Sequence, residues 1–379
     1  MSRSVLLASN CNVWREPFNG QSHAFLNVIA GVEQAQLLAP PGLPYLVGHG
    51  VRPSVGYLLN ETFYRLWSQA RIAAGSAGLS SMQPSRIDED YDLFFFVCQF
   101  PHELSALKRM QGWRKRSKLA ACYILETWSS SLHEVKANLR MLDDFDRVFV
   151  LNAQSIPELQ RYTSARIVHL APAADCVLAA PQPNCPPRTI DVYSFGRRSD
   201  AVHEQLMRLS RESGSFHYVY DSLKGGSVVD WDEHRALISG FMKRSRFFMA
   251  FNPGDIGGGG KGRWKNEHAL STRYFEGAAG GAVILGTAPR CADYDVAFDW
   301  DDALIHLDPD GDVISLMAEL NRDPERLDTA SRRNVSECLR RHDWSHRWAS
   351  ILDELGFEHT PELHERFAAM RALAEATCP

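Results

Sequence analysis

Two consecutive arginines follow a glycine where a predicted strand gives way to a predicted helix. The strand covers residues 191–195, Gly196 ends it, and Arg197 and Arg198 come next. A glycine at such a point lets backbone approach a ligand, and free N–H groups at the start of a helix attract phosphate. Guanidinium groups suit phosphate oxygens. The pattern predicts phosphate binding, and a tight turn with solvated arginines is the alternative.

A glycine-rich loop that carries three cations spans residues 254–268. Its sequence superficially resembles a P-loop. In a P-loop, however, serine or threonine follows the lysine, and here Gly262 follows Lys261, which argues against an ATPase. The remaining signal is the charge of Lys261, Arg263 and Lys265. A loop of this kind can close on an anionic ligand, and a solvated loop is the alternative.

One glutamate, Glu276, stands near the start of a predicted helix of small residues. Ser271 or Thr272 can cap this helix, and residues 278–282 are all alanine or glycine, so the helix can approach a sheet closely. A short buried strand follows. The helix dipole stabilises an acid in an early turn by roughly 0.3–1 kcal/mol, which explains Glu276 without any ligand. A ligand contact and a dipole contact therefore both remain open at this point.

Short apolar runs alternate with helical patterns along the chain and are expected to position these groups. The clearest run, residues 91–100, is continuously apolar, as in a strand covered on both faces. Further strands are predicted at residues 4–9, 35–40, 119–126, 146–152, 165–172, 189–196, 216–220, 246–253, 282–286 and 303–307, with a helical C-terminal stretch of about 60 residues. This rhythm is typical of parallel sheets with crossover helices.

A proline-rich stretch interrupts the rhythm. Residues 179–187 read AAPQPNCPP, which predicts a linker. We therefore expect an α/β chain of two Rossmann-like domains that face a central cleft: residues 1–180, residues 188–357, and a C-terminal helix at residues 358–379 that packs back on the first domain. Ligands of such sheets bind beyond the carboxyl ends of the strands.

The composition is that of a globular protein. The 379 residues are 45% hydrophobic and 23% charged, with a net charge of -5, which provides no general field for nucleic acid. Eight cysteines without a Cys-x-x-Cys pair suggest free thiols in a reducing compartment. The N-terminal apolar run is too short for a signal peptide, and no run reaches the roughly 20 residues of a membrane helix. We expect a cytoplasmic protein that binds no nucleic acid, with peripheral membrane contact left open.

The segment around Glu276 resembles the helix–strand unit of glycosyltransferases with the GT-B fold, in the group that includes the CgeB-like (spore-maturation) proteins. Their pattern runs roughly Arg-x-Phe-Glu-x-x-Ala-x-Gly-Ala, and this chain matches it at Arg273, Phe275, Glu276, Ala279, Gly281 and Ala282. Residues 194–206 resemble the first strand–glycine–arginine unit of the family's donor domain. Residues 342–355 resemble its C-terminal His-x-Trp/Tyr-x-x-Arg helix, with His342, Trp344 and Arg347 in register.

The resemblance implies roles for these residues in binding a nucleotide sugar. It assigns Glu276 to the ribose hydroxyls of the donor and the diphosphate to the arginine turn. With the cations of the glycine-rich loop added, the expected donor-binding set consists of Gly20, Gly196, Arg197, Arg198, Lys261, Arg263, Arg273 and Glu276. Many retaining members of the family carry a second glutamate eight residues before the first. Here that position is His268, with Glu267 one residue further back, and either side chain could contact the sugar.

The first domain is expected to hold the acceptor and any catalytic base. His23 follows the first predicted strand, and a histidine can serve as a base near neutral pH. His49, His102 and Glu126 are rivals because each follows or ends an apolar run. His342 and His346 have a spacing that suits a metal, but no third ligand is apparent, so no metal site is expected.

These observations predict a glycosyltransferase of the hexosyltransferase class. It would move a sugar from a nucleotide diphosphate sugar to a hydroxyl of a glycan, a lipid or a small metabolite. Arginines, lysine and helix N–H groups would neutralise the leaving diphosphate in place of a metal, so no cofactor is expected. A sugar-nucleotide epimerase of the same fold and a non-catalytic nucleotide- or glycan-binding protein are the alternatives.

Overall fold

The computed structural model describes residues 3–43, 62–64, 66–71, 78–182, 185, 187–222, 226–256 and 267–378. The chain divides into two compact units. Unit 1 comprises Met1–Ala171 and Gly225–Trp231, and unit 2 comprises Pro172–Lys224 and Asp232–Pro379. Each unit is an α/β fold built on a parallel sheet, which confirms the predicted class of two Rossmann-like domains.

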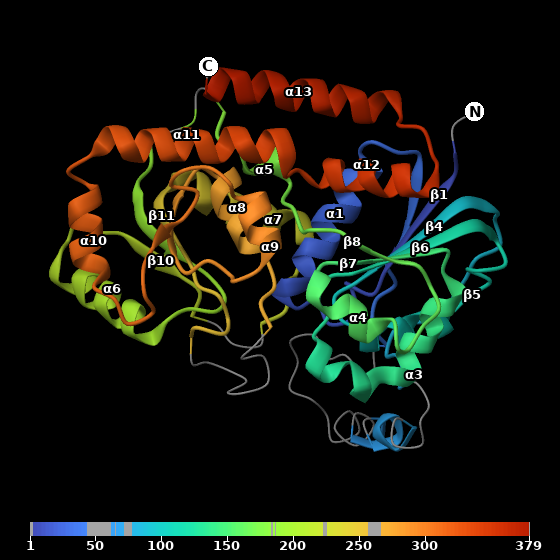
Figure 1. Ribbon diagram of the computed structural model, residues 1–379. Coiled ribbons are helices and arrows are strands. Elements are labelled where there is room, and N and C mark those ends of the chain that lie inside the picture. Colours follow the sequence, from blue (N-terminus) through green and yellow to red (C-terminus); the bar gives the residue numbers. More distant parts are fainter. Residues whose placement is uncertain are drawn as a thin grey trace. The chain divides into compact units, whose positions relative to one another are not determined.

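Unit 1 is built on a six-stranded parallel sheet (Figure 1). The strand order is β2-β1-β4-β6-β7-β8, with bounds β1 Val5–Ser9, β2 Ala35–Leu38, β4 Tyr91–Cys98, β6 Ser117–Ile124, β7 Arg147–Val150 and β8 Ile167–His169. The chain leaves β1 toward β2 on one side and returns to β4 on the other. The order therefore reverses between β1 and β4, where ligands of doubly wound sheets bind.

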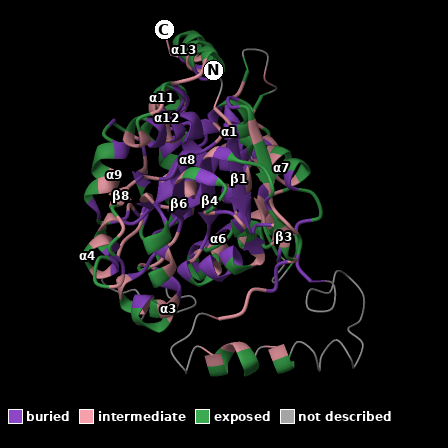
Figure 2. Ribbon diagram, turned by 90° about the vertical axis from the view of Figure 1, so that its right-hand side faces the viewer, coloured by how far each residue is buried: buried purple, intermediate pink, exposed green. Residues whose placement is uncertain are grey.

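Central strands of unit 1 are almost completely buried, and Figure 2 shows β1, β4 and β6 in the colour of buried residues. Phe94 and Phe96 are fully buried on β4 and pack with Trp113 and Phe145. The remaining described elements are short: η1 Pro17–Asn19, α1 Gly20–Ala30, β3 Ser85–Arg86, η2 Pro101–Arg109, β5 Met110–Gln111, η3 Ser129–Val135, α3 Lys136–Leu139, η4 Arg140–Asp144, η5 Ala153–Ser155 and α4 Ile156–Leu159. The continuous apolar run at residues 91–100 is thus a strand covered on both faces, as predicted.

Unit 2 is built on a five-stranded parallel sheet of order β10-β9-β11-β12-β13. Its strands are β9 Ile190–Ser194, β10 Tyr218–Tyr220, β11 Ser245–Ala250, β12 Val283–Gly286 and β13 Ile305–His306. Its helices are α5 Cys176–Ala179, α6 Asp200–Glu212, α7 Trp231–Arg244, α8 Thr272–Ala279, α9 Ala292–Ala297, α10 Val313–Leu320, α11 Pro324–Arg341, α12 Trp344–Leu355 and α13 Pro361–Thr377. The strand order reverses between β9 and β11, so the second ligand position lies at the carboxyl ends of these two strands.

Small residues let α8 lie tightly against its neighbours, as their run in the sequence predicts. A Cβ on Gly277 would stand 2.6 Å from the Phe248 ring of β11, and one on Gly280 would stand 2.5 Å from Met242 of α7. Real Cβ contacts are not that short, so a larger residue at either position would push the helix away. The close packing holds Glu276 at a fixed height above the sheet.

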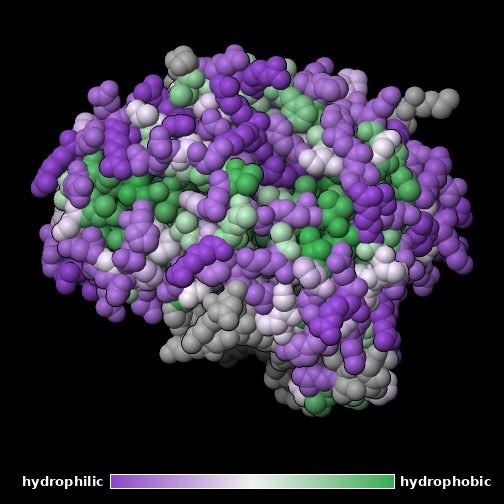
Figure 3. All heavy atoms as spheres, in the orientation of Figure 1, coloured by the Kyte–Doolittle hydropathy of each residue, from purple (hydrophilic) through white to green (hydrophobic). Residues whose placement is uncertain are grey.

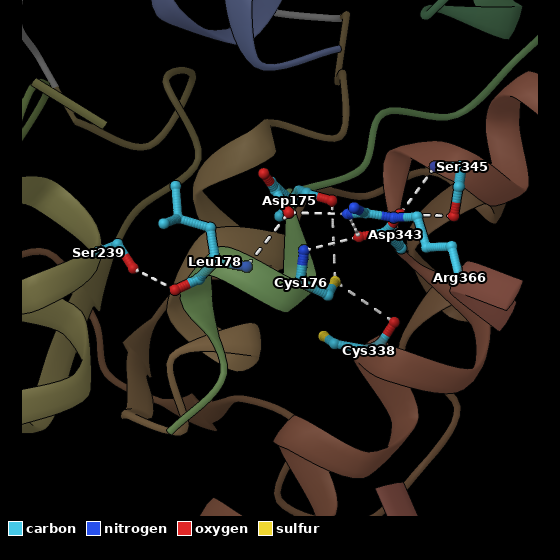
Figure 4. Close-up of polar contacts among 9 residues, drawn as sticks. Asp175, Cys176, Leu178, Ser239, Cys338, Asp343, Ser345 and Arg366 are labelled. Carbon is cyan, nitrogen blue, oxygen red and sulfur yellow. Dashed lines mark hydrogen bonds and ion pairs between the residues drawn. The ribbon is translucent and has the colours of Figure 1, made fainter. Parts of the chain in front are cut away.

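The C-terminal helix α13 is anchored within unit 2 by one arginine (Figure 4). Arg366 donates to both carboxylate oxygens of Asp343 at 2.9 and 2.8 Å and to Asp175 at 2.8 Å. Asp343 is fully buried, caps α12 and also accepts from the backbone N–H of Cys176. The charged network ties α13 to the start of α12 and to Asp175, and apolar contact holds α13 along α11.

One short segment between β10 and α7 belongs to unit 1, although the chain on both sides of it belongs to unit 2. Val228 donates its backbone N–H to the carbonyl of Arg15 at 2.8 Å. Trp231 donates its indole N–H to Asn12 at 2.9 Å and stacks on the ring of His23. We call residues 226–231 the returning segment.

The surface shows apolar side chains gathered in patches on each unit, with hydrophilic residues around them (Figure 3). All eight cysteines are free, and six of them are buried, as the sequence suggested. Among the described residues, no helix combines the length and the apolar character needed to cross a membrane.

Candidate functional site

The arginine turn between β9 and α6 has the backbone that its glycine predicts. Gly196 adopts a φ of 70°, in the left-handed region that favours glycine. Its N–H donates to the carboxylate of Asp221 at 2.9 Å, so this amide is already bonded within the protein. Asp221 directly follows β10, where polar groups at strand ends were expected, yet the sequence reasoning did not single it out.

The two arginines of this turn have different surroundings. Arg198 donates to the carbonyl of Asp221 at 2.9 Å and lies over the ring of Tyr220, so its guanidinium is engaged. Arg197 is exposed, and its guanidinium makes no hydrogen bond or ion pair with the described part of the chain. Arg197 is therefore the cation of this turn that remains available to an anionic ligand.

Arg273 holds the backbone of the arginine turn. Its guanidinium donates to the carbonyl of Arg197 at 2.7 Å and lies 3.5 Å from that of Phe195. Burial, together with the nearby charge of Arg197, lowers the pKa of Arg273 to about 10, which leaves it charged at neutral pH. The contacts make Arg273 a residue that positions the turn.

Glu276 lies on α8 three residues after Arg273, so both project from the same side of the helix. Its carboxylate accepts a hydrogen bond from Arg235 of α7 at 2.5 Å. The side chains are only 8% and 13% exposed, respectively. The Nε of Arg235 is buried and finds no hydrogen-bond partner among the described residues. Arg235 was missed by the sequence reasoning because nothing in a helical run marks one exposed-looking arginine as the partner of a distant glutamate.

A polar group follows β11 at the same edge of the sheet. Asn252 donates its backbone N–H to Thr287, and its side-chain amide lies 2.9 Å from Nδ1 of His268. His268 and Glu267 are both half-buried. The structure thus brings His268 to the end of β11, and Asn252 joins it without having been predicted. Lys261 and Arg263 lie outside the described residues.

In unit 1, Gly20 and His23 lie on the first turn of α1, directly after the connection from β1. Gly20 is the first residue of the helix and has an ordinary right-handed conformation with φ of -59°. The ring of His23 stacks on Trp231 of the returning segment, with centroids 5.9 Å apart and planes 22° apart. His102 is exposed, and its ring stacks on Phe100. His49 lies outside the described residues.

The strand ends of unit 1 hold a chain of hydrogen bonds that leads to Glu126. Gln21 donates to Gln99 at 2.5 Å, and Gln99 donates to one oxygen of Glu126 at 3.2 Å. The indole of Trp128 donates to the other oxygen at 2.7 Å. Gln99 was missed by the sequence reasoning, although its place just after the clearest strand could have marked it.

The C-terminal motif is structural. His342 is buried and donates from Nε2 to the carbonyl of Ala297 at 2.7 Å. Arg347 binds the carbonyl of Pro172 through two nitrogens, at 3.2 and 2.9 Å. The motif joins the C-terminal helices to the first residues of unit 2. No group of three or more potential metal-ligating side chains occurs among the residues that the structure describes.

Comparison with known proteins relates part of the chain to one family and its fold to solved structures. Residues 197–353 match the family described as glycosyl transferase-like. No curated protein sequence matches the chain. HepE of Anabaena, solved in complex with UDP, is 11% identical with a TM-score of 0.51, and the similarity covers 94% of this chain and 100% of HepE. An α-glucosyltransferase in complex with UDP and DNA is 10% identical with a TM-score of 0.53, covering 94% and 100% of the two chains.

At these identities the structural likeness establishes the fold, and the family match covers most of unit 2. The match begins at Arg197 in the arginine turn and includes both Arg235 and Glu276. The chain therefore has the fold of these two structures, and residues 197–353 are similar to the glycosyl transferase-like family.

Proposed function

We propose that the protein transfers a hexosyl group from a nucleotide diphosphate sugar, with UDP-glucose as the first candidate, to a hydroxyl of a glycan, a lipid or a small metabolite. The HepE and α-glucosyltransferase structures contain UDP, and the latter also occurs with UDP-glucose and DNA. The proposal rests most on one observation. Arg273 joins the arginine turn to the helical turn that carries Glu276, at the point where the strand order of unit 2 reverses.

The residues around this point suit the two polar parts of a nucleotide diphosphate. Arg197 offers a guanidinium for the diphosphate, where a charged hydrogen bond contributes about 1.5–3 kcal/mol. Glu276 offers a carboxylate for ribose hydroxyls, while Arg235 limits its motion. Glu276 is the fifth residue of α8 and lies beyond its first turn, so its stabilising partner within the protein is Arg235 and not the helix dipole.

The transfer would depend on positive side chains placed where negative charge develops on the leaving diphosphate. The acceptor oxygen forms a bond to the anomeric carbon and gives its proton to the base, while the bond from that carbon to the diphosphate breaks and its electron pair leaves with the diphosphate. Arg197 would neutralise that charge, assisted by Lys261 and Arg263. A cation supplied by the protein makes a divalent metal unnecessary, so we propose a metal-independent reaction with no cofactor. His268 and His23 remain the candidates for contacts to the sugar and for the base, respectively.

A thermal-shift panel tests the donor. UDP, GDP, TDP and CMP, and the sugars of each, are added with and without EDTA. A ligand at 100 times its Kd stabilises the folded state by about 2.7 kcal/mol, and the shift is expected to survive EDTA and to shrink in Arg197→Ala. The matched control, Arg211→Ala, removes an exposed arginine from the far end of α6 and should keep the full shift.

Turnover then separates the reaction classes. Transfer that requires an added hydroxyl compound supports the proposal. Conversion of the donor sugar without any acceptor would assign the chain to the epimerases, and nucleotide binding without any turnover would assign it to the binding proteins. Loss of the shift on EDTA treatment would contradict metal independence.

A further inference from the structure

We propose that an amphipathic helical segment of unit 1, at residues 62–71, binds the surface of an anionic lipid bilayer. The structure describes residues 62–64 and 66–71 of this segment, and all of them are helical. None of these residues belongs to the proposed donor site. The surface therefore goes beyond the proposed function, because it concerns where the protein is held and not which sugar it transfers.

The apolar side chains of this segment form one stripe, and the stripe faces outward. It consists of Phe63, Leu66, Trp67 and Ala70, whose spacing of i, i+3, i+4 and i+7 places them on one helix face. Phe63 is 71% exposed, Leu66 60% and Trp67 55%, and Figure 2 draws the segment in the colours of exposed and intermediate residues. Helices of globular proteins usually turn such a face to the core, so an outward apolar stripe indicates an interaction surface.

A different face of the segment is anchored to unit 1. The hydroxyl of Tyr64 donates to the carbonyl of Ser80, and the hydroxyl of Ser68 accepts from the backbone N–H of Leu79 at 3.0 Å. The ring of Tyr64 packs against the core of unit 1. Arg109 donates to the same carbonyl of Ser80 at 3.2 Å. These contacts determine which face points inward, so the apolar stripe cannot turn to the core without breaking them.

Positive charge lies beside the apolar stripe. Residues 62–71 include two arginines and no acidic residue. Burial, together with the nearby charge of Arg71, lowers the pKa of Lys108, so the two cations are neighbours. Lys108 is exposed near the end of η2. Neighbouring cations next to aromatic and aliphatic side chains complement anionic headgroups that lie above acyl chains.

The types of apolar side chain also favour a bilayer. Tryptophan is enriched at membrane–water interfaces, where its ring lies at the level of the headgroups. An interfacial helix lies in the plane of the membrane, with its apolar face buried and its cations at the headgroups. Such contact requires no membrane-spanning helix, and none occurs in the described part of the chain. The cations beside the stripe favour an anionic bilayer over a second protein chain.

Co-sedimentation of the full chain with unilamellar vesicles tests this surface. One set of vesicles contains phosphatidylcholine alone, and the other contains equal amounts of phosphatidylcholine and phosphatidylglycerol. We expect the protein to bind the mixed vesicles more tightly. Trp67→Ser should lower the partition coefficient about tenfold, and Phe63→Ser with Trp67→Ser about 100-fold, because a tenfold loss corresponds to about 1.4 kcal/mol, near the lower limit for burying one large apolar side chain.

Lys108→Gln tests the contribution of charge. It should weaken binding to the mixed vesicles about fivefold, since one cation near an anionic surface contributes about 1 kcal/mol, and should leave binding to phosphatidylcholine unchanged. Added salt should weaken binding of the wild type to the mixed vesicles in the same direction.

Two exposed positions of unit 2 provide matched controls. Val296→Ser removes an apolar side chain that is 74% exposed on α9, and Arg211→Gln removes a cation from the last turn of α6. Both variants should bind vesicles like the wild type. Melting temperatures should stay unchanged in all variants, because every substituted side chain is exposed.

Absence of binding to the mixed vesicles, or equal binding by the wild type and the double variant, would overturn the proposal. Equal binding of the wild type to both kinds of vesicle would refute the part assigned to Arg71 and Lys108. Self-association that the double variant abolishes, in a protein that does not bind vesicles, would assign the stripe to a contact between two copies of the chain and would also overturn the proposal.

Discussion

The pair formed by Glu276 and Arg235 gives a prediction that separates folding from catalysis. The side chains are 8% and 13% exposed, and the two charged atoms are 2.5 Å apart. Glu276→Ala leaves a buried guanidinium without its counter-charge, which costs about 3–5 kcal/mol. For a domain of this size, each kcal/mol lowers the melting temperature by about 2–4 °C, so a fall of roughly 6–20 °C is expected.

The double variant Glu276→Ala with Arg235→Ala removes the whole pair. The stranded charge is gone, so most of the lost stability should return, with a coupling energy of about 0.5–3 kcal/mol in the double-mutant cycle. The ribose contact cannot return, because the carboxylate is still missing. The value of kcat/KM for the nucleotide sugar should therefore stay about 10- to 150-fold below that of the wild type.

Melting curves and initial rates on the four proteins of the cycle provide the measurement. Glu319→Ala, at an exposed position on α10, is the matched control and should change neither quantity. Recovery of kcat/KM together with stability in the double variant would refute the donor role and leave Glu276 as a partner of Arg235. A Glu276→Ala protein with wild-type stability would refute the reasoning from the buried pair.

Three further predictions concern single groups. Arg197→Ala should weaken binding of UDP about 10- to 150-fold in calorimetry without lowering the melting temperature, because its guanidinium is exposed; a destabilised variant with normal affinity would contradict this. Burial raises the pKa of Glu103 from 4.5 to about 7, so the unfolded chain loses this proton at lower pH than the folded chain. Stability therefore falls by about 3 kcal/mol as pH rises through this window. Urea unfolding between pH 4.5 and 7 should show that the free energy of unfolding of Glu103→Gln depends less on pH than that of the wild type. An equal dependence on pH in both proteins would contradict this role of Glu103. Burial and the charge of Arg347 lower the pKa of His342 from 6.5 to about 3, so the unfolded chain takes up a proton that the folded chain refuses, and up to about 5 kcal/mol of stability is lost as pH falls through this window. His342→Gln should lose less stability than the wild type between pH 6.5 and 4, and an equal loss would rule out this account.

The strands of both sheets were predictable because their signal is local. Parallel strands buried on both faces read as short apolar runs, and residues 91–100 form such a run. The close packing of α8 was also predictable from the sequence, since small residues occupy the positions that contact Phe248 and Met242. The returning segment was not predictable, because no local pattern records that six residues pack on the other unit.

The candidate site was predictable at strand ends and not elsewhere. Gly196 and Arg197 follow a strand directly, and the rule that ligands bind at carboxyl ends selects them. That rule does not select Arg235, because this residue lies within a helix. Its place at the site comes from its hydrogen bond to Glu276, 41 residues away in the chain. Nor does a pattern of residue types tell whether Arg273 faces a ligand or, as the structure has it, the carbonyl of Arg197.

The returning segment also determines how this protein can be divided into fragments or recombined with another chain. The chain passes between the units after residues 171, 224 and 231, so no single cut separates them. A fragment that begins at Pro172 would carry Trp231 and Val228 away from Asn12 and Arg15, and would expose apolar surface that is 4% and 7% accessible in the whole protein. A chimera that takes unit 2 from another protein of this fold must therefore keep residues 226–231 from the same protein as unit 1. An exchange of unit 2 therefore needs three junctions, and the third lies one helical turn before Arg235.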